Sequence, residues 1–256
     1  TYRFQVSIHT VGVHGLRAPL RVAQLSDLHF GPFIHTGSVR RWVNATLRAR
    51  PDLIVMTGDW LDTKTRGDLT PLLAELSRLS APLGVWGVWG NHDYGSFGAV
   101  RGGEEPWQRG GVKKLEQFGN RLAQLGIRLL RNEGAHVRPD LYLCGVDDLW
   151  RGEPDLRAAL RDAGEGARVL LSHNPDLLPQ VPTNVDLTLC GHTHGGQVRL
   201  PLLGALTTAS RYGERFAQGF VRGPAPGFVS RGLGVSGLPV RLNCPAEVVL
   251  LNLVPG

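Results

Sequence analysis

The chain has 256 residues, of which 42% are hydrophobic and 20% are charged, and it carries a net charge of +6. These values are ordinary for a globular protein, and the length allows a sizeable core within one domain. The sequence excludes a membrane-spanning helix, because no apolar run approaches the roughly 18 residues required, and no cleavable signal is visible.

Strands and helices alternate over the first two thirds of the chain. Apolar periodicity predicts strands at residues 21–26, 52–57, 83–89, 127–130, 136–137, 141–146 and 169–172. It predicts helices near residues 38–48, 68–79, 112–125 and 156–163. Thr36 or Ser38 is a candidate cap for the first helix, and Asp68 is one for the second.

The character of the chain changes after Leu187. Short strands are predicted at residues 198–200, 216–222, 228–231, 240–243 and 247–253, set among Gly and Pro, which is typical of antiparallel β structure. No repeat or linker divides the chain. We therefore expect one α/β domain spanning residues 1–256, with two sheets that each bury a face.

Two irregular stretches directly follow polar motifs. Residues 95–111 are rich in Gly, and residues 201–209 carry the apolar side chains Leu202, Leu203 and Leu206. Loops of this size beside a reactive site often contact the substrate, although a plain connection is the alternative interpretation.

Five polar motifs follow apolar, strand-like runs. They are Asp27-Leu28-His29, Gly58-Asp59, Gly90-Asn91-His92-Asp93, Ser172-His173 and Gly191-His192-Thr193-His194. A polar residue at the end of a buried strand is held by the sheet and opens onto its rim. Five such ends can converge on one point, so we expect the motifs to form a single site.

The donor types in these motifs suit a pair of cations. Asp27 and His29 point to the same side of an extended segment, and the two oxygens of Asp59 can bridge two metals. With the Asn91 amide and the imidazoles of the remaining histidines, the set mixes oxygen and nitrogen. It suits Mn²⁺, Fe or Zn²⁺ better than Mg²⁺ or Ca²⁺, and two divalent ions, first of all Mn²⁺, are expected.

Two bound metals would polarise a phosphoryl oxygen and activate a bridging hydroxide for attack on phosphorus. His92 follows Asn91 and is the candidate acid that protonates the leaving oxygen. Asp93 is the candidate partner that holds the His92 ring. His92 and Asp93 are therefore the expected catalytic residues, and Asn91 and His92 are also expected to contact the substrate.

Together the motifs resemble the calcineurin-like metallophosphoesterase superfamily, whose pattern D-x-H, G-D, G-N-H-[DE], H and G-H-x-H they meet in full between residues 27 and 194. The resemblance implies a four-layer α/β/β/α sandwich of two mixed sheets. It also implies the ligands of each metal. One would be held by Asp27, His29, Asp59 and His194, and the other by Asp59, Asn91, His173 and His192.

A finer resemblance is to the bacterial YkuE/YaeI-type branch. The segments that carry it include 24–29, 171–176, 191–197, 229–234 and 238–241. Members of that branch are often anchored at, or exported through, the membrane, and some relatives cleave UDP-2,3-diacylglucosamine. The implied substrate is a lipid-linked or nucleotide-type phosphodiester, or a phosphomonoester. The implied location is the cytoplasm or the periphery of a membrane, with a trimmed N-terminal anchor or export signal compatible with the start at Thr1.

The basic charge is dispersed along the chain, with no run of five or more basic residues. A modest positive field favours anionic partners such as phosphates, acidic lipid headgroups or nucleic acid, and an arginine-rich solvated surface explains it equally well. The three cysteines, Cys144, Cys190 and Cys244, include no C-x-x-C, so neither a disulfide framework nor a zinc knuckle is predicted.

Several further residues have two interpretations each. Arg231 either clamps a substrate phosphate or forms a structural salt bridge, and Asp62 either supports Asp59 or caps a turn. Gln197 either orients a site histidine or lies in a turn. We expect the rest to be structural or surface residues: Trp60 in packing, Asp147 and Asp148 in a surface turn, and His9, His14, His35 and His136 outside any motif, with a substrate contact as the alternative for His35.

Three functions compete on this sequence. The first is a bimetallic phosphoesterase with a small-molecule or lipid-linked phosphoester substrate and peripheral membrane contact. The second is a nuclease of the same chemistry, which is less favoured because no basic stripe with interleaved aromatic residues is present. The third is a non-catalytic metal-binding scaffold, which the complete set of expected ligands disfavours.

Overall fold

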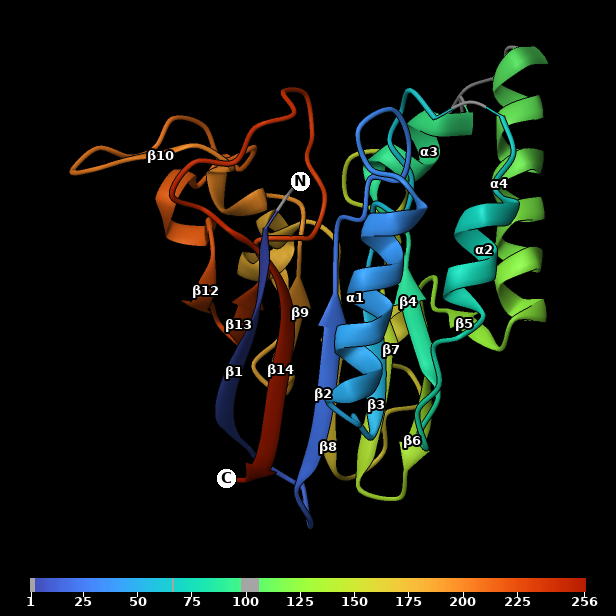
Figure 1. The fold of residues 1–256 in the computed structure, drawn as a ribbon. Coiled ribbons are helices and arrows are strands. Elements are labelled where there is room, and N and C mark those ends of the chain that lie inside the picture. Colours follow the sequence, from blue (N-terminus) through green and yellow to red (C-terminus); the bar gives the residue numbers. More distant parts are fainter. Residues whose placement is uncertain (1–2, 66, 98–105) are drawn as a thin grey trace.

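The computed structural model describes residues 3–256 with the exception of residue 66 and residues 98–105. Two six-stranded sheets lie face to face, and helices cover the outer face of each sheet (Figure 1). This arrangement is the predicted four-layer α/β/β/α sandwich.

The first sheet joins both ends of the chain to its first α/β units. Its strands, in spatial order, are β1 (Phe4–Val13), β14 (Ala246–Pro255), β2 (Leu20–Leu25), β3 (Leu53–Thr57), β4 (Val85–Val88) and β5 (Ile127–Leu129). The strands from β2 to β5 are parallel, whereas β14 runs antiparallel to β2 and parallel to β1. The sheet is therefore mixed.

The second sheet has the same kind of mixed pairing. Its strands, in spatial order, are β12 (Gly219–Arg222), β13 (Pro226–Val229), β9 (Leu187–Cys190), β8 (Ala167–Leu171), β7 (Leu141–Gly145) and β6 (Glu133–Arg138). The four central strands are parallel, and β12 and β6 are antiparallel at the two edges. A separate short hairpin is formed by β10 (Arg199–Leu200) and β11 (Gly204–Ala205).

The helices follow the strands in sequence. The α-helices are α1 (Thr36–Arg48), α2 (Thr70–Leu76), α3 (Asn91–Phe97), α4 (Pro106–Gln124) and α5 (Leu156–Ala159), and the 3₁₀ helices are η1 (Pro175–Gln180), η2 (His194–Gly196) and η3 (Gly213–Phe216). Within the described residues, no helix is both long and apolar enough to cross a bilayer.

Side-chain alternation along each central strand builds two cores at once. On β3, Ile54 and Met56 pack with α1, α2 and α4 on the outer side. Leu53 and Val55 point the other way and join residues of β7, β8 and β9 between the sheets. A strand buried on both faces has no polar side, which explains why the central strands are continuous apolar runs.

The expected order of strands and helices in the first two thirds of the chain is confirmed. The expected caps of α1 are wrong, because the N-cap position is His35 and no side chain caps the helix. Asp68 does accept hydrogen bonds from the backbone and hydroxyl of Thr70 at the start of α2, although the N-cap position itself is Leu69.

The tail departs from the predicted antiparallel system. Residues 240–243 form no strand, and only Leu242 makes an isolated bridge, to Val198. β13 pairs parallel with β9 in the second sheet. The chain then returns to the first sheet, where β14 pairs with β2. Strand β1 was not predicted, because most of its residues are exposed or half-exposed and the hydrophobic signal is weak. The alternation of apolar and polar residues indicates that a segment forms a strand, but it does not determine which other strand that segment pairs with.

The stretch 95–111, expected to be irregular, is helical at both ends. Helix α3 includes Gly95, and α4 begins at Pro106. The intervening residues 98–105 lie outside the described part of the chain, so the expected substrate contact from this stretch stays a prediction.

Candidate metal centre

The five polar motifs lie at the carboxyl ends of parallel strands in both sheets. Asp27 and Asp59 stand two residues beyond β2 and β3, and His173 and His192 stand two residues beyond β8 and β9. Asn91 is the first residue of α3, which follows β4. These strands end at the same edge of the sandwich (Figure 1), so the motifs converge as predicted.

The backbone of the site is unusual in a way that marks function. Eleven described residues other than glycine have a positive φ, and five of them are expected ligands, namely Asp27, His29, Asp59, His192 and His194. An L-residue in this conformation costs free energy, and such residues concentrate where the surrounding structure enforces a functional geometry.

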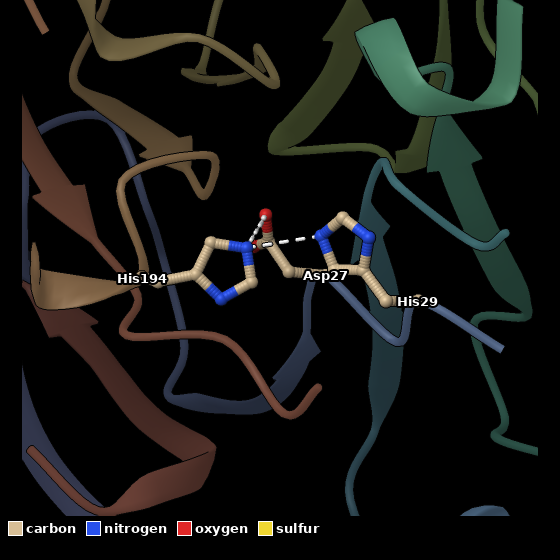
Figure 2. Close-up of side chains that lie close together, drawn as sticks. All are labelled: Asp27, His29 and His194. Atoms are coloured by element: carbon tan, nitrogen blue, oxygen red, sulfur yellow. Dashed lines mark hydrogen bonds and ion pairs between the residues drawn. The ribbon is translucent and has the colours of Figure 1, made fainter. Parts of the chain in front are cut away.

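One cluster consists of Asp27, His29 and His194 (Figure 2). The Nε2 atoms of the two histidines lie 2.9 Å apart, and Nε2 of His194 lies 3.6 Å from Oδ1 of Asp27. All three side chains are buried. Residues that are 165 positions apart in the sequence thus point their donor atoms at one spot.

A second cluster consists of Asp59, His173 and His192, with Asn91 beside it. Nε2 of His173 lies 3.1 Å from Nδ1 of His192 and 3.2 Å from Oδ1 of Asn91. Oδ2 of Asp59 lies 3.2 Å from Nε2 of His173 and 3.4 Å from Nε2 of His29, so it stands between the two clusters. All seven expected ligands are brought together.

The spacing of the donor atoms fits a coordinated cation. Metal–ligand bonds of about 2.0–2.2 Å place neighbouring ligand atoms roughly 3.0–3.5 Å apart. The observed separations of 2.9–3.6 Å cover this range. Two pairs of ring nitrogens also face each other closely, an arrangement that a shared cation would stabilise.

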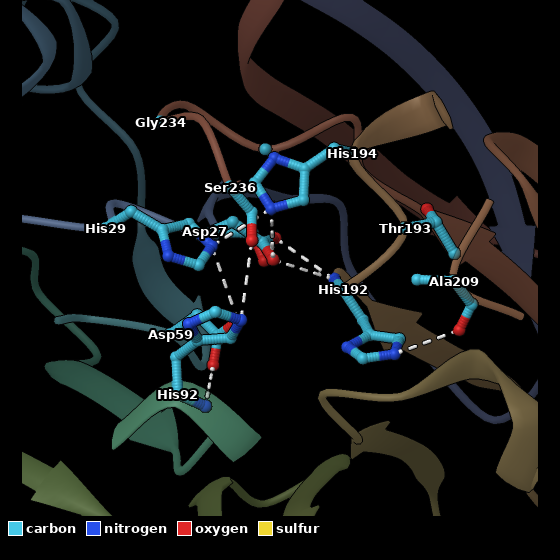
Figure 3. Close-up of polar contacts among 12 residues, drawn as sticks. Asp27, His29, Asp59, His92, His192, Thr193, His194, Ala209, Gly234 and Ser236 are labelled. Atoms are coloured by element: carbon cyan, nitrogen blue, oxygen red, sulfur yellow. Dashed lines mark hydrogen bonds and ion pairs between the residues drawn. The ribbon is translucent and has the colours of Figure 1, made fainter. Parts of the chain in front are cut away.

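The outer nitrogens of His173 and His192 are held by backbone carbonyls, which leave their inner nitrogens free to act as ligands. Nδ1 of His173 donates to the Thr57 carbonyl at 2.7 Å. Nε2 of His192 donates to the Ala209 carbonyl at 3.2 Å, as Figure 3 shows. Nδ1 of His29 lies 3.9 Å from the carboxylate of Asp62. Such outer partners select the tautomer that binds a metal. Asp62 therefore lies near His29, and it accepts the Lys64 amide in a turn.

Burial and mutual charge shift the titration of these groups strongly. Burial lowers the pKa of His29 and His192 to about 3, so both are neutral at physiological pH. Burial also disfavours charge on His173, but the carboxylate of Asp59 outweighs it and raises the pKa of His173 to about 10. A proton on His173 thus supplies positive charge that the carboxylates require and that a bound cation would provide.

His92 lies at the edge of the two clusters. Its Nδ1 lies 2.7 Å from Oγ1 of Thr63, and its Nε2 lies 3.4 Å from Oγ of Ser236 (Figure 3). The expectation that Asp93 holds this ring is wrong. The buried carboxylate of Asp93 instead accepts the backbone N–H groups of Gly90 and Leu61, so it secures the turn that carries the motif.

Comparison with known proteins agrees with this geometry. The sequence profile of the calcineurin-like phosphoesterases matches residues 20–196. The chain belongs to the calcineurin-like phosphoesterase family.

Relatives of this calcineurin-like phosphoesterase match nearly the whole chain. It is 30% identical over 245 residues to the uncharacterized metallophosphoesterase YkuE of Bacillus subtilis, covering 91% of this chain and 78% of YkuE. It is 31% identical over 248 residues to the phosphodiesterase YaeI of Escherichia coli, covering 93% and 83%. An uncharacterized metallophosphoesterase of Aquifex aeolicus is 30% identical over 265 residues, covering 99% and 93%. The chain is therefore a metal-dependent phosphoester hydrolase by family.

A cavity of about 410 Å³ adjoins the candidate metal centre. Asp59, Asn91 and His192 form part of its lining, together with His92. Its apolar lining comes from other segments, namely Trp150, Val198, Leu206 and Leu238. The expectation that the 201–209 stretch lies beside the site is confirmed for Leu206 and for Thr207, Thr208 and Ala209, which also line the cavity.

Two acidic residues expected in a surface turn are buried beside the centre. Asp147 accepts hydrogen bonds from Tyr94 of α3 and from Nε of Arg131, so it ties the second sheet to the helix that begins with Asn91. Asp148 is 1% exposed and accepts the backbone N–H groups of residues 150 and 151. Burial raises the pKa of Asp148 to about 6, although the charge of His173 opposes this.

The contacts of Arg231 and Gln197 distinguish between the two roles that the sequence allowed for each residue. Arg231 forms an ion pair with the buried Glu247 and does not line the cavity, so the structural salt bridge is observed in place of the expected substrate contact. Gln197 donates to the carbonyls of Ser236 and Leu238 and accepts the Ser236 amide, so it holds that segment and not a histidine.

Two residues that contact the centre were assigned no role in the sequence analysis. Arg241 places Nη2 3.1 Å from Nδ1 of His194 and donates to the Arg231 and Gly234 carbonyls, so it joins that loop to the ligand. The ring of Trp150 meets His192 edge to face at 4.3 Å. Neither residue stands in a metal-binding motif, and only its position in the fold reveals it. Trp60 is fully buried, as expected.

Proposed function

We propose that the protein is a two-metal phosphodiesterase whose natural substrate has an apolar, lipid-linked part. The observation that carries this proposal is the position of the two ligand clusters, which share Asp59 at one end of a cavity with a partly apolar lining. A phosphodiester group would bind at the clusters, and an apolar substituent would lie along Leu206 and Leu238.

The proposed ligands of one cation are Asp27, His29, Asp59 and His194, and those of the other are Asp59, Asn91, His173 and His192. When bound, the two cations would polarise the phosphoryl oxygen and activate water for attack on phosphorus. The mixed donor set favours Mn²⁺, and Fe or Zn²⁺ fits the same atoms.

In this proposal His92 is the acid that protonates the leaving oxygen. Its Nε2 faces the cavity beside Ser236, while Thr63 holds Nδ1 and so fixes the plane of the ring. The backbone N–H of His92 donates to Oδ1 of Asp59 at 2.9 Å, which places the acid at a constant position relative to the bridging carboxylate. Asp93 contributes through the turn at Gly90 and not by direct contact with the ring.

The apolar lining favours a lipid-linked substrate, and the name of the relative YaeI, a phosphodiesterase, favours a diester. Val198 and Leu238 offer no hydrogen bonds to a second sugar or base, whereas Trp150 offers a ring face or edge to either kind of group. UDP-2,3-diacylglucosamine, which has both a nucleotide and acyl chains, is the representative test substrate.

We also infer that residues 1–256 act as one domain. The cluster between the sheets contains residues from the first sheet, such as Val22 and Val249, and from the second, such as Leu143 and Val169. Separating the two sheets would expose this shared hydrophobic core to solvent. The cytoplasm or the surface of a membrane is the expected location.

The test combines metal analysis with hydrolysis. The protein loaded with Mn²⁺ should hold two ions per chain and should cleave bis-p-nitrophenyl phosphate and UDP-2,3-diacylglucosamine. Asn91→Ala should lose an ion and activity together, whereas His92→Ala should keep both ions and lose most of its activity toward a diester with an alkyl leaving group, which requires the acid. Arg128→Ala, on the edge strand β5 and outside the cavity lining, is the control and should keep both ions and full activity.

Three results would overturn the proposal. A single bound ion would remove the two-metal mechanism, and full metal loading with no turnover of any phosphoester would leave a binding scaffold. Cleavage of DNA at rates above those for bis-p-nitrophenyl phosphate and UDP-2,3-diacylglucosamine would identify a nuclease.

A further inference from the structure

Six large aliphatic side chains are exposed on two segments at the mouth of the cavity. This aliphatic rim consists of Leu202, Leu203, Leu206, Leu238, Val240 and Leu242. Leu202 at the tip of the β10–β11 hairpin is fully exposed, and Leu203 is 76% exposed. Contiguous exposed apolar surface in a folded protein usually marks an interaction site.

The two segments of the rim are joined to each other. The backbone N–H of Arg199 donates to the Leu242 carbonyl at 3.0 Å, and the N–H of Leu242 donates to the Gln197 carbonyl at 3.0 Å. The side chain of Asn243 donates to the Arg199 carbonyl. These bonds hold the two segments beside each other, so the rim is one surface.

The rim is continuous with the cavity. Leu206 and Leu238 belong to both, since each is largely exposed and each lines the cavity that contains Asn91 and His92. An apolar chain lying on the rim would therefore enter the cavity along Leu206 and Leu238.

Basic side chains flank the rim. Arg211 and Arg215 are exposed in the segment after the hairpin, and Arg211 also pairs with Asp176. Glu214 connects this segment to the hairpin, because it accepts the Ala205 N–H and pairs with Arg199. On the other segment, Arg3 lies with Pro239 and Val240 around one surface hollow. Positive groups around protruding aliphatic side chains complement an anionic headgroup layer above acyl chains.

We propose that the aliphatic rim docks on the surface of a lipid bilayer, with the hairpin tip inserted among the headgroups. This inference rests on the proposed function, because docking would bring the cavity mouth to the surface where a lipid-linked phosphodiester resides. A protruding tip such as Leu202 buries little area against a rigid protein face, whereas a fluid interface closes around it.

Vesicle flotation tests the docking separately from catalysis. The protein is floated with phosphatidylcholine vesicles that contain or lack phosphatidylglycerol, and the bound fraction is measured with no substrate present. The wild type should bind, and binding should strengthen with the anionic lipid. The double variant Leu202→Asp, Leu203→Asp should bind about tenfold or more weakly, because two apolar anchors are replaced by like charges.

The matched control changes two exposed aliphatic residues outside the two rim segments, Val6→Asp and Ile8→Asp on β1, with the same change in net charge. It should bind vesicles like the wild type. Both double variants should hydrolyse the soluble diester bis-p-nitrophenyl phosphate at the wild-type rate, and only the rim variant should lose turnover of a vesicle-borne substrate.

Two outcomes would overturn the proposal. One is equal vesicle binding by the wild type and the rim variant, or none by either. The other is a dimer in light scattering that the rim changes dissociate, which would assign the surface to a second copy of the chain. Because flotation requires no turnover, failure of the docking and failure of the proposed phosphodiesterase function give different results.

Discussion

Nδ1 of His92 lies 2.7 Å from the hydroxyl oxygen of Thr63, a residue in the loop that also carries Asp59. The proposed acid is therefore oriented by a neutral hydroxyl from the neighbouring strand end and not by the adjacent carboxylate of Asp93. The protonated ring would donate through Nδ1 to Thr63 and keep Nε2–H directed into the cavity.

Thr63→Val should lower kcat for a diester with an alkyl leaving group by about 10–100-fold, because the ring loses its orientation for proton transfer. The p-nitrophenyl diester should be affected much less, since its leaving oxygen needs no proton. Thr63→Ser retains the hydroxyl and should restore the alkyl diester rate. Equal losses on both substrates would contradict the assigned role.

Tyr94→Phe should loosen the helix that begins with Asn91. The phenol hydroxyl donates to the buried carboxylate of Asp147, and hydrogen bonds to charged groups contribute about 1.5–3 kcal/mol. We expect a loss of that size in chemical denaturation and a several-fold loss of kcat. Tyr142→Phe is the control, because its hydroxyl binds the Ala159 carbonyl in the outer layer. It should reduce stability alone, and an equal effect on kcat would argue against a specific link.

Glu247→Gln should reduce stability in a pH-dependent way. Burial alone would raise the pKa of Glu247, but the hydrogen bonds and charge of Arg231 outweigh it and hold the pKa below its ordinary value. The carboxylate therefore contributes stability above the ordinary pKa of about 4.3, and this contribution is lost as the pH falls through the lower folded-state value.

Urea denaturation at a series of pH values measures the effect. The variant should be less stable than the wild type by about 2 kcal/mol at pH 7, and the difference should shrink below about pH 4. Glu116→Gln, at an exposed position, should match the wild type throughout. A difference that stays constant down to acid pH would show that the ion pair with Arg231 is not its source.

Gly58→Ala should lower both the stability of the protein and its affinity for metal, because it changes the backbone beside His173. Gly58 has a φ of +87°, and a Cβ there would lie 2.6 Å from Nδ1 of His173. We expect a stability loss of about 1–2 kcal/mol from the conformation alone and a metal affinity lower by about 10–100-fold from displacement of the ring. Calorimetric titration with Mn²⁺ measures the second effect.

The control for Gly58 is Gly126, which has a φ of +80° and open space around its Cβ position. Gly126→Ala should show the stability loss with unchanged metal affinity. Unchanged metal affinity in both variants would mean that His173 does not depend on this close contact.

Much of the centre was predictable because its residues lie at fixed positions after apolar strands. The motif from Gly90 to Asp93 and the pair His192 and His194 have polar side chains where a core strand has just ended, and no packing role explains them. The order of β2, β3 and β4 along the chain, with helices between them, was expected from strand–helix alternation. The edge strand β1 was missed because its residues are too exposed to show a buried face.

The sequence by itself determined the types of metal-binding donor, their order and the strand ends that carry them, since these are local properties of a strand and the turn after it. Only the tertiary structure decided that Thr63 rather than Asp93 holds His92, that Arg231 pairs with Glu247, and that Arg241 reaches His194. The reason is physical: these contacts depend on how two sheets pack and where distant loops meet, and nothing in local periodicity encodes which side chains such packing brings within hydrogen-bonding distance.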